Sequence, residues 1–249
     1  MNTVLRRGET VVRESGPWSP TIHRLLRHMR AKGVPWLPEP LGFDREGKEI
    51  LSFVPGEVPH DTPDWLWSET LLAEIARALR QLHDASADFE TDDARWQLEA
   101  RTPREVICHN DFAPYNTTFI DGHFAGLIDF DTCAPGPRLW DIAYSAYRFV
   151  PLMPPHGEID AFPGSEHAPF SRDKQLVRLR RFLAVYAGDC AAWCYPIEAV
   201  LEQAASRLEV LARFSDAAAI RSLREELSAH AHMYRAHAAC LRRMAAQAV

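Results

Sequence analysis

The 249-residue sequence lacks several features that define whole classes of protein. It has no run of eighteen uninterrupted apolar residues, which excludes a helix long enough to span a bilayer. No apolar stretch follows the arginines of the first ten residues, so we expect no secretory signal. The five cysteines are an odd number with neither a zinc spacing nor a disulfide framework, which favours a reducing, cytoplasmic location.

Basic residues are also fewer than acidic residues. There are 28 Lys and Arg against 34 Asp and Glu, a net charge of −6 that argues against nucleic acid as a main partner. What is present is the composition of an ordinary globular protein, with 47% hydrophobic and 25% charged residues. The length suffices for one large domain or two small ones.

The first sixty residues predict a small β-sheet with one helix. Residues 3–13 predict a hairpin that turns at Gly8. Ser19-Pro20 predicts a helix start, with the serine as N-cap, and Gly33 predicts its end. Residues 49–54 predict a short strand.

The rest of the chain predicts mainly helices. Residues 106–108 and the hairpin 117–130, with its Asp-Gly turn, are the exceptions. Helices are predicted over residues 64–84, 139–149, 172–187, 196–214 and 217–246. The proline-rich residues 151–171 predict a long loop.

The chemically informative residues lie between positions 109 and 141. His109, Asp111 and Asn116 have the spacing H-x-D-x-x-x-x-N, for which this composition gives roughly 0.01 accidental matches. Thirteen residues later, Asp129 stands at the end of an apolar strand. This pattern is typical of the catalytic loop of protein-kinase-like phosphotransferases. A hydrolase metal site opening on the same His and Asp is the alternative, but no second closely spaced histidine motif supports it.

Phosphoryl transfer gives these residue types a physical role. Its transition state spreads negative charge over the phosphoryl oxygens, so catalysis depends on positioning and on cations. Magnesium takes oxygen ligands, usually only one or two from protein, and Asn116 and Asp129 can supply them. Asp111 then remains to orient the attacking hydroxyl or to accept its proton.

At these residues the sequence resembles the aminoglycoside phosphotransferase and choline kinase-like family. The resemblance covers most of the chain and is strongest at Ile107–Asn116, Leu127–Asp131 and Gly136–Ala143. It implies an α+β, bilobal protein-kinase-like fold, with a small N-terminal β-sheet lobe holding one helix and a larger, mainly helical C-terminal lobe. Residues 1–57 would form the nucleotide-side lobe and the linker, and residues 58–249 the catalytic lobe.

The same resemblance implies roles for single residues. Asp111 would be the catalytic aspartate, and His109 would orient its loop through backbone contacts. Asn116 and Asp129 would bind Mg²⁺. Asp141, at a helix start, looks like the buried aspartate that braces the catalytic loop.

The nucleotide side departs from the family pattern. Ser52, Phe53 and Val54 resemble the linker whose backbone meets the adenine of ATP, with GTP as the alternative nucleotide. A kinase-like lobe also uses a glycine-rich loop, a strand lysine and a helix glutamate. Here Arg13 stands at the lysine position, only Gly8 precedes it among glycines, and the predicted helix has no acidic residue. Arginine keeps the charge but presents it with a different geometry.

Three other groups allow more than one interpretation. Asp131 could be a second metal contact or could cap the turn that follows it. His230 and His237 could share a helix face as a weak surface metal site. Cys190 and Cys194 are four residues apart, as many ligand pairs on helices are, but the Ala and Trp around them favour buried free thiols.

The function predicted from these features is an ATP- and Mg²⁺-dependent O-phosphotransferase acting on a hydroxyl of a small molecule, with no nucleic acid or membrane partner. In the family, residues corresponding to 151–249 set acceptor specificity. Here they are nearly neutral and include Arg178, Arg180 and Arg181, which argues against a polycationic aminoglycoside. The alternatives are a catalytically impaired nucleotide-binding protein and an interaction protein, such as one giving immunity to a toxic peptide.

Overall fold

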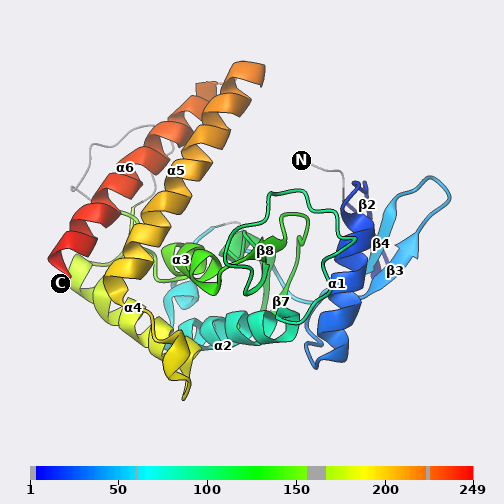
Figure 1. The fold of residues 1–249 in the computed structure, drawn as a ribbon, viewed down its shortest axis with the longest axis horizontal. Helices are drawn as coiled ribbons and strands as arrows, with labels where there is room; N and C mark the ends of the chain where they lie inside the picture. Colours follow the sequence, from blue (N-terminus) through cyan, green and yellow to red (C-terminus); the bar gives the residue numbers. More distant parts are fainter. Residues whose placement is uncertain (1–3, 60, 156–166, 223–224, 249) are drawn as a thin grey trace. The chain divides into compact units, whose positions relative to one another are not determined.

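The computed structural model describes residues 4–59, 61–155, 167–222 and 225–248 (Figure 1). The chain divides into two compact units, residues 1–141 and residues 142–249. The lobe boundary expected near residue 57 lies inside the first unit and stays a prediction. The α+β fold class is confirmed, because one antiparallel sheet precedes a mainly helical remainder.

A four-stranded antiparallel sheet opens the first unit, in the order β1-β2-β4-β3. Its strands are β1 (Leu5–Arg7), β2 (Thr10–Arg13), β3 (Pro40–Phe43) and β4 (Glu49–Ser52). The β1–β2 hairpin turns at Gly8 as predicted, with a φ of +61° that suits glycine. Strand β3 has no sequence signal, because a proline and a glycine stand among its four residues.

Helix α1 (Ser19–Ala31) lies beside this sheet and buries isoleucine, leucine and methionine side chains (Figure 1). The expectation that Ser19 is the N-cap is wrong, because Trp18 occupies that position without a side-chain cap. The Ser19 hydroxyl instead accepts a hydrogen bond from the backbone N–H of Gly16, at 3.0 Å. The serine therefore stabilises the turn before the helix.

Helix α2 (Glu69–Ser86) follows the strand region. It begins at Ser68, whose hydroxyl accepts a hydrogen bond from the backbone N–H of Leu71 at 3.1 Å. A short 3₁₀ helix, η1 (Asp64–Trp67), precedes it. The single helix predicted over residues 64–84 is therefore two elements, because the extended backbone of Ser68 separates them.

Two small antiparallel sheets support the region of the predicted catalytic loop. They pair β5 (Val106–Cys108) with β8 (Ala134–Gly136), and β6 (Thr117–Ile120) with β7 (His123–Leu127). The 3₁₀ helix η2 (Pro114–Asn116) leads into β6. Asp121 and Gly122, with φ values of +51° and +77°, form the tight turn predicted between β6 and β7.

The described part of the second unit is mainly helical. Beyond the end of α3 (Arg138–Phe149), it contains α4 (Arg172–Ala187), η3 (Ala191–Trp193), α5 (Ile197–Ser222) and α6 (Glu225–Gln247). Helices α5 and α6 lie side by side as a long hairpin (Figure 1). Helix α4 has the predicted bounds. Helix α5 continues past its predicted end at residue 214, because no glycine or proline interrupts the following turns.

Several expectations for the second unit are wrong. Cys190 is half-buried and Cys194 is exposed, because α4 ends before them and they flank the short η3. His230 is exposed, whereas His237 is fully buried and its Nδ1 lies 2.7 Å from the Tyr147 hydroxyl. The two histidines therefore do not share a surface. No group of three or more His, Cys, Asp or Glu able to hold a metal occurs among the residues described above.

Arg178 also differs from its expected place on an acceptor-facing surface. It is 2% exposed, and its Nη2 donates to the backbone oxygen of Phe149 at 3.4 Å. Its guanidinium lies 4.8 Å from the centre of the Phe170 ring. The side chain therefore belongs to the interior of the second unit and carries no argument about acceptor charge.

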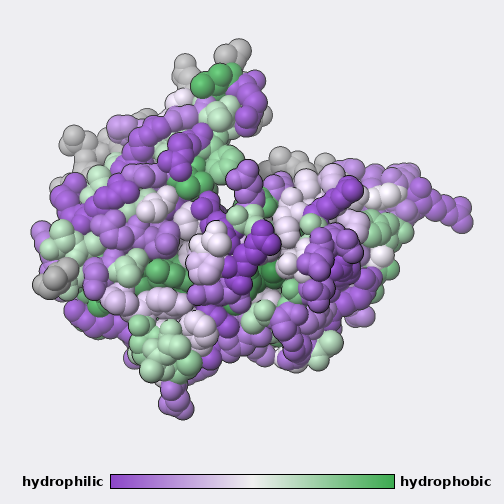
Figure 2. All heavy atoms as spheres, in the orientation of Figure 1, coloured by the Kyte–Doolittle hydropathy of each residue, from purple (hydrophilic) through white to green (hydrophobic). Residues whose placement is uncertain are grey.

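Of the predicted proline-rich loop, residues 156–166 lie outside the described residues. On either side of them, Pro155 and Ala168 form a single β-bridge. Among the helices described, none is both long and apolar enough to cross a membrane. On the face drawn in Figure 2, hydrophobic side chains form small patches among hydrophilic ones.

Candidate active site

The predicted catalytic loop runs from the end of β5 to η2, within the first unit. At its start, Asn110 adopts a left-handed backbone with a φ of +67°. The Asp141 carboxylate accepts hydrogen bonds from the backbone N–H groups of His109 at 2.8 Å and Asn110 at 2.9 Å. Asp141 therefore braces the loop, in the arrangement that the sequence resemblance implied.

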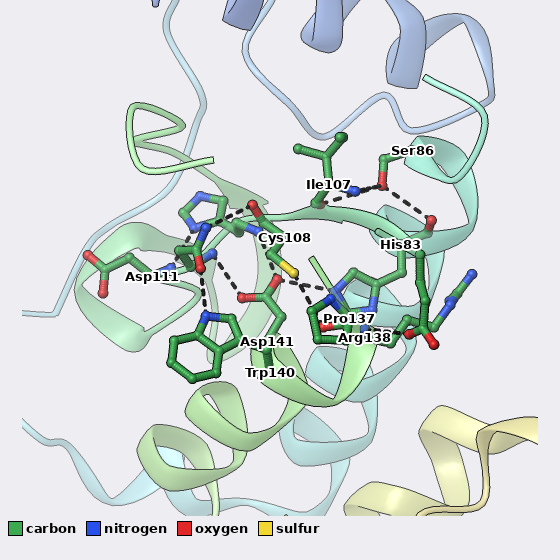
Figure 3. A network of polar contacts seen from close by, with 12 residues as sticks. His83, Ser86, Ile107, Cys108, Asp111, Pro137, Arg138, Trp140 and Asp141 are labelled. Atoms are coloured by element: carbon green, nitrogen blue, oxygen red, sulfur yellow. Dashed lines mark hydrogen bonds and ion pairs between the residues drawn. The ribbon is translucent and has the colours of Figure 1, made fainter. Parts of the chain in front are cut away.

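Asp141 is fully buried, and Figure 3 shows it at the centre of a polar network. Burial favours a raised pKa, but the hydrogen bonds from His83 and from the His109 backbone lower the pKa of Asp141 overall. Burial lowers the pKa of His83, whose Nε2 lies 3.2 Å from Asp141. Because an ionised carboxylate only accepts hydrogen bonds, the neutral imidazole donates from Nε2.

Side chains that the sequence reasoning did not single out complete this network. The Asn110 side chain donates to the backbone oxygen of Thr132 at 2.8 Å and accepts from Trp140 Nε1 at 2.9 Å. The Thr132 hydroxyl donates to the backbone oxygen of His109 at 2.9 Å. A sequence signal existed for Asn110 alone, because asparagine is enriched at left-handed positions. His83 and Trp140 stand on helical faces that predict only packing.

His109 connects the loop to the strand end before Asp129. Its Nδ1 accepts a hydrogen bond from the backbone N–H of Asp111 at 3.3 Å. Its Nε2 therefore carries the proton and donates to the backbone oxygen of Ile128 at 3.1 Å. The imidazole is fully buried, and its contacts are those of a residue that orients backbone, as expected.

Both carboxylate oxygens of Asp111 have partners. Asn116 Nδ2 lies 2.9 Å from Asp111 Oδ2 and also 2.9 Å from the Asp111 backbone oxygen. The Tyr115 hydroxyl donates to Asp111 Oδ1 at 2.5 Å. Because Asn116 donates through Nδ2, its amide oxygen is left for another ligand, and none of the described residues donates to that oxygen.

Arg13 lies opposite this loop on β2 and contacts three carboxylates. Its Nε donates to Glu49 Oε2 at 2.5 Å, and its Nη1 and Nη2 reach Asp129 at 3.1 Å and Asp131 at 2.6 Å. Burial disfavours the guanidinium charge, but the attraction of Glu49, Asp131 and Asp129 outweighs it and raises the pKa of Arg13. The arginine is therefore charged, although it is only 8% exposed.

Glu49 takes the place of the glutamate that the sequence reasoning sought in the helix. It lies on β4 directly across from Arg13 in the strand register and is fully buried. Its Oε1 lies 3.1 Å from Nε2 of His23, on α1, and the His23 ring stacks on Phe43 at 4.6 Å. Against the effect of burial, the contacts with His23 and Arg13 lower the pKa of Glu49. The signal missed in the sequence was an acidic residue at an inward position of a predicted strand.

Among the described residues, Asp131 has no hydrogen bond to the turn that follows it, and its role as a second metal contact stays a prediction. Its carboxylate pairs with Arg13 Nη2, and 13% of its side chain is exposed. Burial raises the pKa of Asp131, as do Asp129 and Glu49, while Arg13 opposes the change. Asp129 differs, because half of its side chain is exposed and its φ is +62°. Of the two carboxylates, that of Asp129 is thus the more accessible to a ligand.

A cavity of about 780 Å³ opens beside these groups, within the usual size range of ligand pockets. Arg13, Asn116, Asp129 and Asp131 line it together with apolar side chains that include Val11, Leu51, Val54 and Ile128. Ser52 and Phe53 also line it, and their contact with a nucleotide base stays a prediction. Their backbone N–H groups, however, donate within the sheet region, to Glu39 and Glu9, at 2.8 Å each. Those two N–H groups are therefore already paired within the protein.

The residues of this cavity fit a nucleoside triphosphate with Mg²⁺. The Thr118 hydroxyl is buried and has no hydrogen-bond partner among the residues described, although Thr118 lines the cavity. A polar ligand atom would relieve the cost of that unpaired group. Apolar walls suit a base, and Arg13 suits phosphate oxygens. The Asn116 amide oxygen and the Asp129 carboxylate are the oxygen ligands that Mg²⁺ takes from proteins.

Solved structures with the same architecture define the class of fold. A choline/ethanolamine kinase family protein from Mesorhizobium loti superposes with a TM-score of 0.61 at 14% identity, covering 99% of this chain and 88% of that one. A protein of Ralstonia eutropha JMP134, assigned as an aminoglycoside phosphotransferase, superposes with a TM-score of 0.63 at 12% identity, covering 99% and 93%. The protein-kinase-like fold expected from the sequence is confirmed.

Part of the chain is also similar in sequence to known proteins. Residues 87–161, which contain the predicted catalytic loop, Asp129 and Asp141, match the model of the Phosphotransferase enzyme family. The trifolitoxin immunity protein of Rhizobium leguminosarum bv. trifolii is 40% identical over 140 residues, which is 53% of this chain and 52% of that protein. The similarity thus spans about half the length of this relative. The resemblance to aminoglycoside phosphotransferases and choline kinases is confirmed.

Proposed function

We propose that this protein is an ATP- and Mg²⁺-dependent O-phosphotransferase whose acceptor is a hydroxyl of a small molecule. One observation carries the proposal. Asn116 and Asp129 line the same cavity as Arg13, and Asn116 also donates to the carboxylate of Asp111. The groups proposed as base, metal ligands and phosphate-binding cation are thus close together.

The proposed reaction assigns a role to each group. The hydroxyl oxygen of the acceptor would bond to the γ-phosphorus of ATP while the bond from that phosphorus to ADP breaks. Asp111 would accept the proton of this hydroxyl. His109 and Asp141 hold the loop that carries this carboxylate. Mg²⁺ held by Asn116 and Asp129 would supply positive charge to the phosphoryl oxygens. These roles use every residue of the loop motif.

Arg13 would bind phosphate oxygens in place of the strand lysine. Glu49 holds its Nε, so that Nη1 and Nη2 face the cavity side where Asp129 and Asp131 lie. Nucleotide binding would then exchange the contact with the accessible Asp129 for contacts with phosphate. A planar guanidinium can make two parallel hydrogen bonds to such oxygens.

A nucleotide titration tests this function. Calorimetry and thermal denaturation with ATP and GTP, each with and without Mg²⁺, should show binding that Mg²⁺ strengthens. A nucleotide at 100 times its Kd stabilises the folded state by about 2.7 kcal/mol. In Asp129→Ala, the Mg²⁺-dependent part of the binding should fall. Binding of neither nucleotide would contradict the proposal.

Immunity to a toxin is a second candidate function, favoured by the 40% identity to the trifolitoxin immunity protein. That function could operate by phosphorylation of a hydroxyl or by binding alone. Expression of the wild-type chain and of Asp111→Asn in a trifolitoxin-sensitive strain separates the two. Protection by the wild type alone supports transfer, equal protection supports binding, and protection by neither contradicts the immunity candidate.

A further inference from the structure

Tyr115 holds a position that the proposed reaction does not account for. It lies in η2, four residues after Asp111, and 42% of it is exposed. Its hydroxyl donates to Asp111 Oδ1 at 2.5 Å, the shortest of the hydrogen bonds described above for this carboxylate. An O–H group is therefore already bound to the proposed catalytic base.

The other contacts of Asp111 show which oxygen an acceptor would meet. Asn116 holds Oδ2, and Asn116 is itself 6% exposed and lines the nucleotide cavity. Figure 3 shows the Asp111 carboxylate pointing away from the buried network around Asp141. Oδ1 is thus the oxygen that does not face the metal ligand, and a hydroxyl donor occupies it.

An acceptor alcohol would have to donate the same kind of hydrogen bond to Asp111 as the Tyr115 hydroxyl does. A general base must lie within about 2.6–3.2 Å of the hydroxyl oxygen whose proton it takes. The Tyr115 phenol meets Asp111 in the same way as an acceptor alcohol would, through one O–H donor. Tyr115 is 42% exposed, so its side chain is not enclosed in the interior.

We propose that the Tyr115 hydroxyl occupies the acceptor position on Asp111 and keeps water from that oxygen until an acceptor hydroxyl displaces it. This inference rests on the proposed phosphotransferase function. The reaction it suppresses is hydrolysis: water donates to Oδ1, its oxygen bonds to the γ-phosphorus, the bond to ADP breaks, and Asp111 takes the proton. The products are ADP and inorganic phosphate. Tyr115 is thus a positioning residue that favours transfer to an alcohol over transfer to water.

The test measures ATP hydrolysis by the full chain with Mg²⁺ and without any acceptor. Tyr115→Phe should hydrolyse ATP about tenfold faster than the wild type, because water gains access to Oδ1. Its Kd for ATP and its thermal denaturation midpoint should match those of the wild type. Tyr195→Phe, at a half-buried tyrosine of the second unit, serves as the matched control and should behave as the wild type. Adding Asp111→Asn to Tyr115→Phe should abolish the increase.

Other outcomes overturn the proposal or separate it from the function beneath it. Unchanged or slower hydrolysis in Tyr115→Phe, with ATP still bound, overturns the role of Tyr115 and leaves nucleotide binding intact. An increase that survives Asp111→Asn also overturns it, because the gain would not pass through Oδ1. Phosphate found on Tyr115 by mass spectrometry would make the residue an acceptor instead. If the wild type does not bind ATP, the proposed phosphotransferase function itself is contradicted.

Discussion

The charged and polar side chains on the two sides of the candidate site are positioned in different ways. On the side of the predicted catalytic loop, His109, Asp111 and Asn116 have the spacing typical of kinase-like phosphotransferases. On the side of the proposed nucleotide site, the positive charge is Arg13, and Glu49, its glutamate partner, comes from a neighbouring strand. The loop motif depends on its spacing, because hydrogen bonds to its backbone position it. A charge pair can move between elements as long as its atoms meet.

The catalytic-loop side should show the largest single effect. In Asp111→Asn, we expect phosphoryl transfer to fall by about 10²–10⁴-fold, because the amide cannot accept the acceptor proton. ATP affinity should stay within a small factor of the wild type, since Asp111 does not line the cavity. Turnover assays and calorimetry on the same preparations check both parts. Full turnover in this variant would remove Asp111 from its assigned role.

On the nucleotide side, the strongest perturbation is the loss of Arg13. In Arg13→Ala, Glu49, Asp129 and Asp131 lose their common counter-charge, and we expect a loss of about 3–5 kcal/mol in the free energy of unfolding. Arg13→Lys should lose less stability, because it keeps the charge without the three-way geometry. Urea denaturation measures these changes.

The exposed Arg45, in the turn between β3 and β4, supplies the control for that experiment. Arg45→Ala should have the urea midpoint of the wild type. If Arg13→Ala is as stable as this control, then the cluster of carboxylates around Arg13 does not stabilise the fold.

The contribution of Asp141, which braces the predicted catalytic loop, to the free energy of unfolding should depend on pH. Because the pKa of Asp141 is lowered on folding, its charge contributes stability above the unfolded pKa of about 3.9, and that stability is lost as the pH falls through the folded value. Asp141→Asn should therefore cost about 2–3 kcal/mol at pH 7 and progressively less below pH 4. Urea denaturation at several pH values checks this, with exposed Asp93→Asn as control. A cost independent of pH would assign the effect to shape instead of charge.

The smallest expected effect concerns Thr118, which lines the cavity. Thr118→Val removes the unpaired buried hydroxyl, so the nucleotide-free protein should gain about 1 kcal/mol of stability. The same variant should bind ATP about fivefold more weakly, because a polar ligand atom loses its partner. Thr118→Ser keeps the hydroxyl and should keep the ATP affinity. Thermal denaturation measures the gain in stability, and calorimetry measures the loss of ATP affinity. Unchanged ATP affinity in Thr118→Val would exclude a contact between this hydroxyl and the nucleotide.

Local patterns predicted much of the fold, and the misses have identifiable causes. The first hairpin, α4 and the turn at Asp121-Gly122 follow from local residue preferences and appear where expected. Ser19 is misassigned as a cap because its hydroxyl bonds outward to the preceding turn. The burial of His237 depends on the Tyr147 hydroxyl, ninety positions away in sequence, so no local pattern could indicate it.

The identities and spacing of His109, Asp111, Asn116 and Asp129 follow from the amino-acid sequence alone, because one short loop and one hairpin carry them all. The partners of the site residues depend on the folded chain. Asp141 reaches the loop from α3, and Glu49 reaches Arg13 across two paired strands. Backbone geometry relates residues a few positions apart, whereas ion pairs and hydrogen bonds between distant segments exist only once the chain has folded.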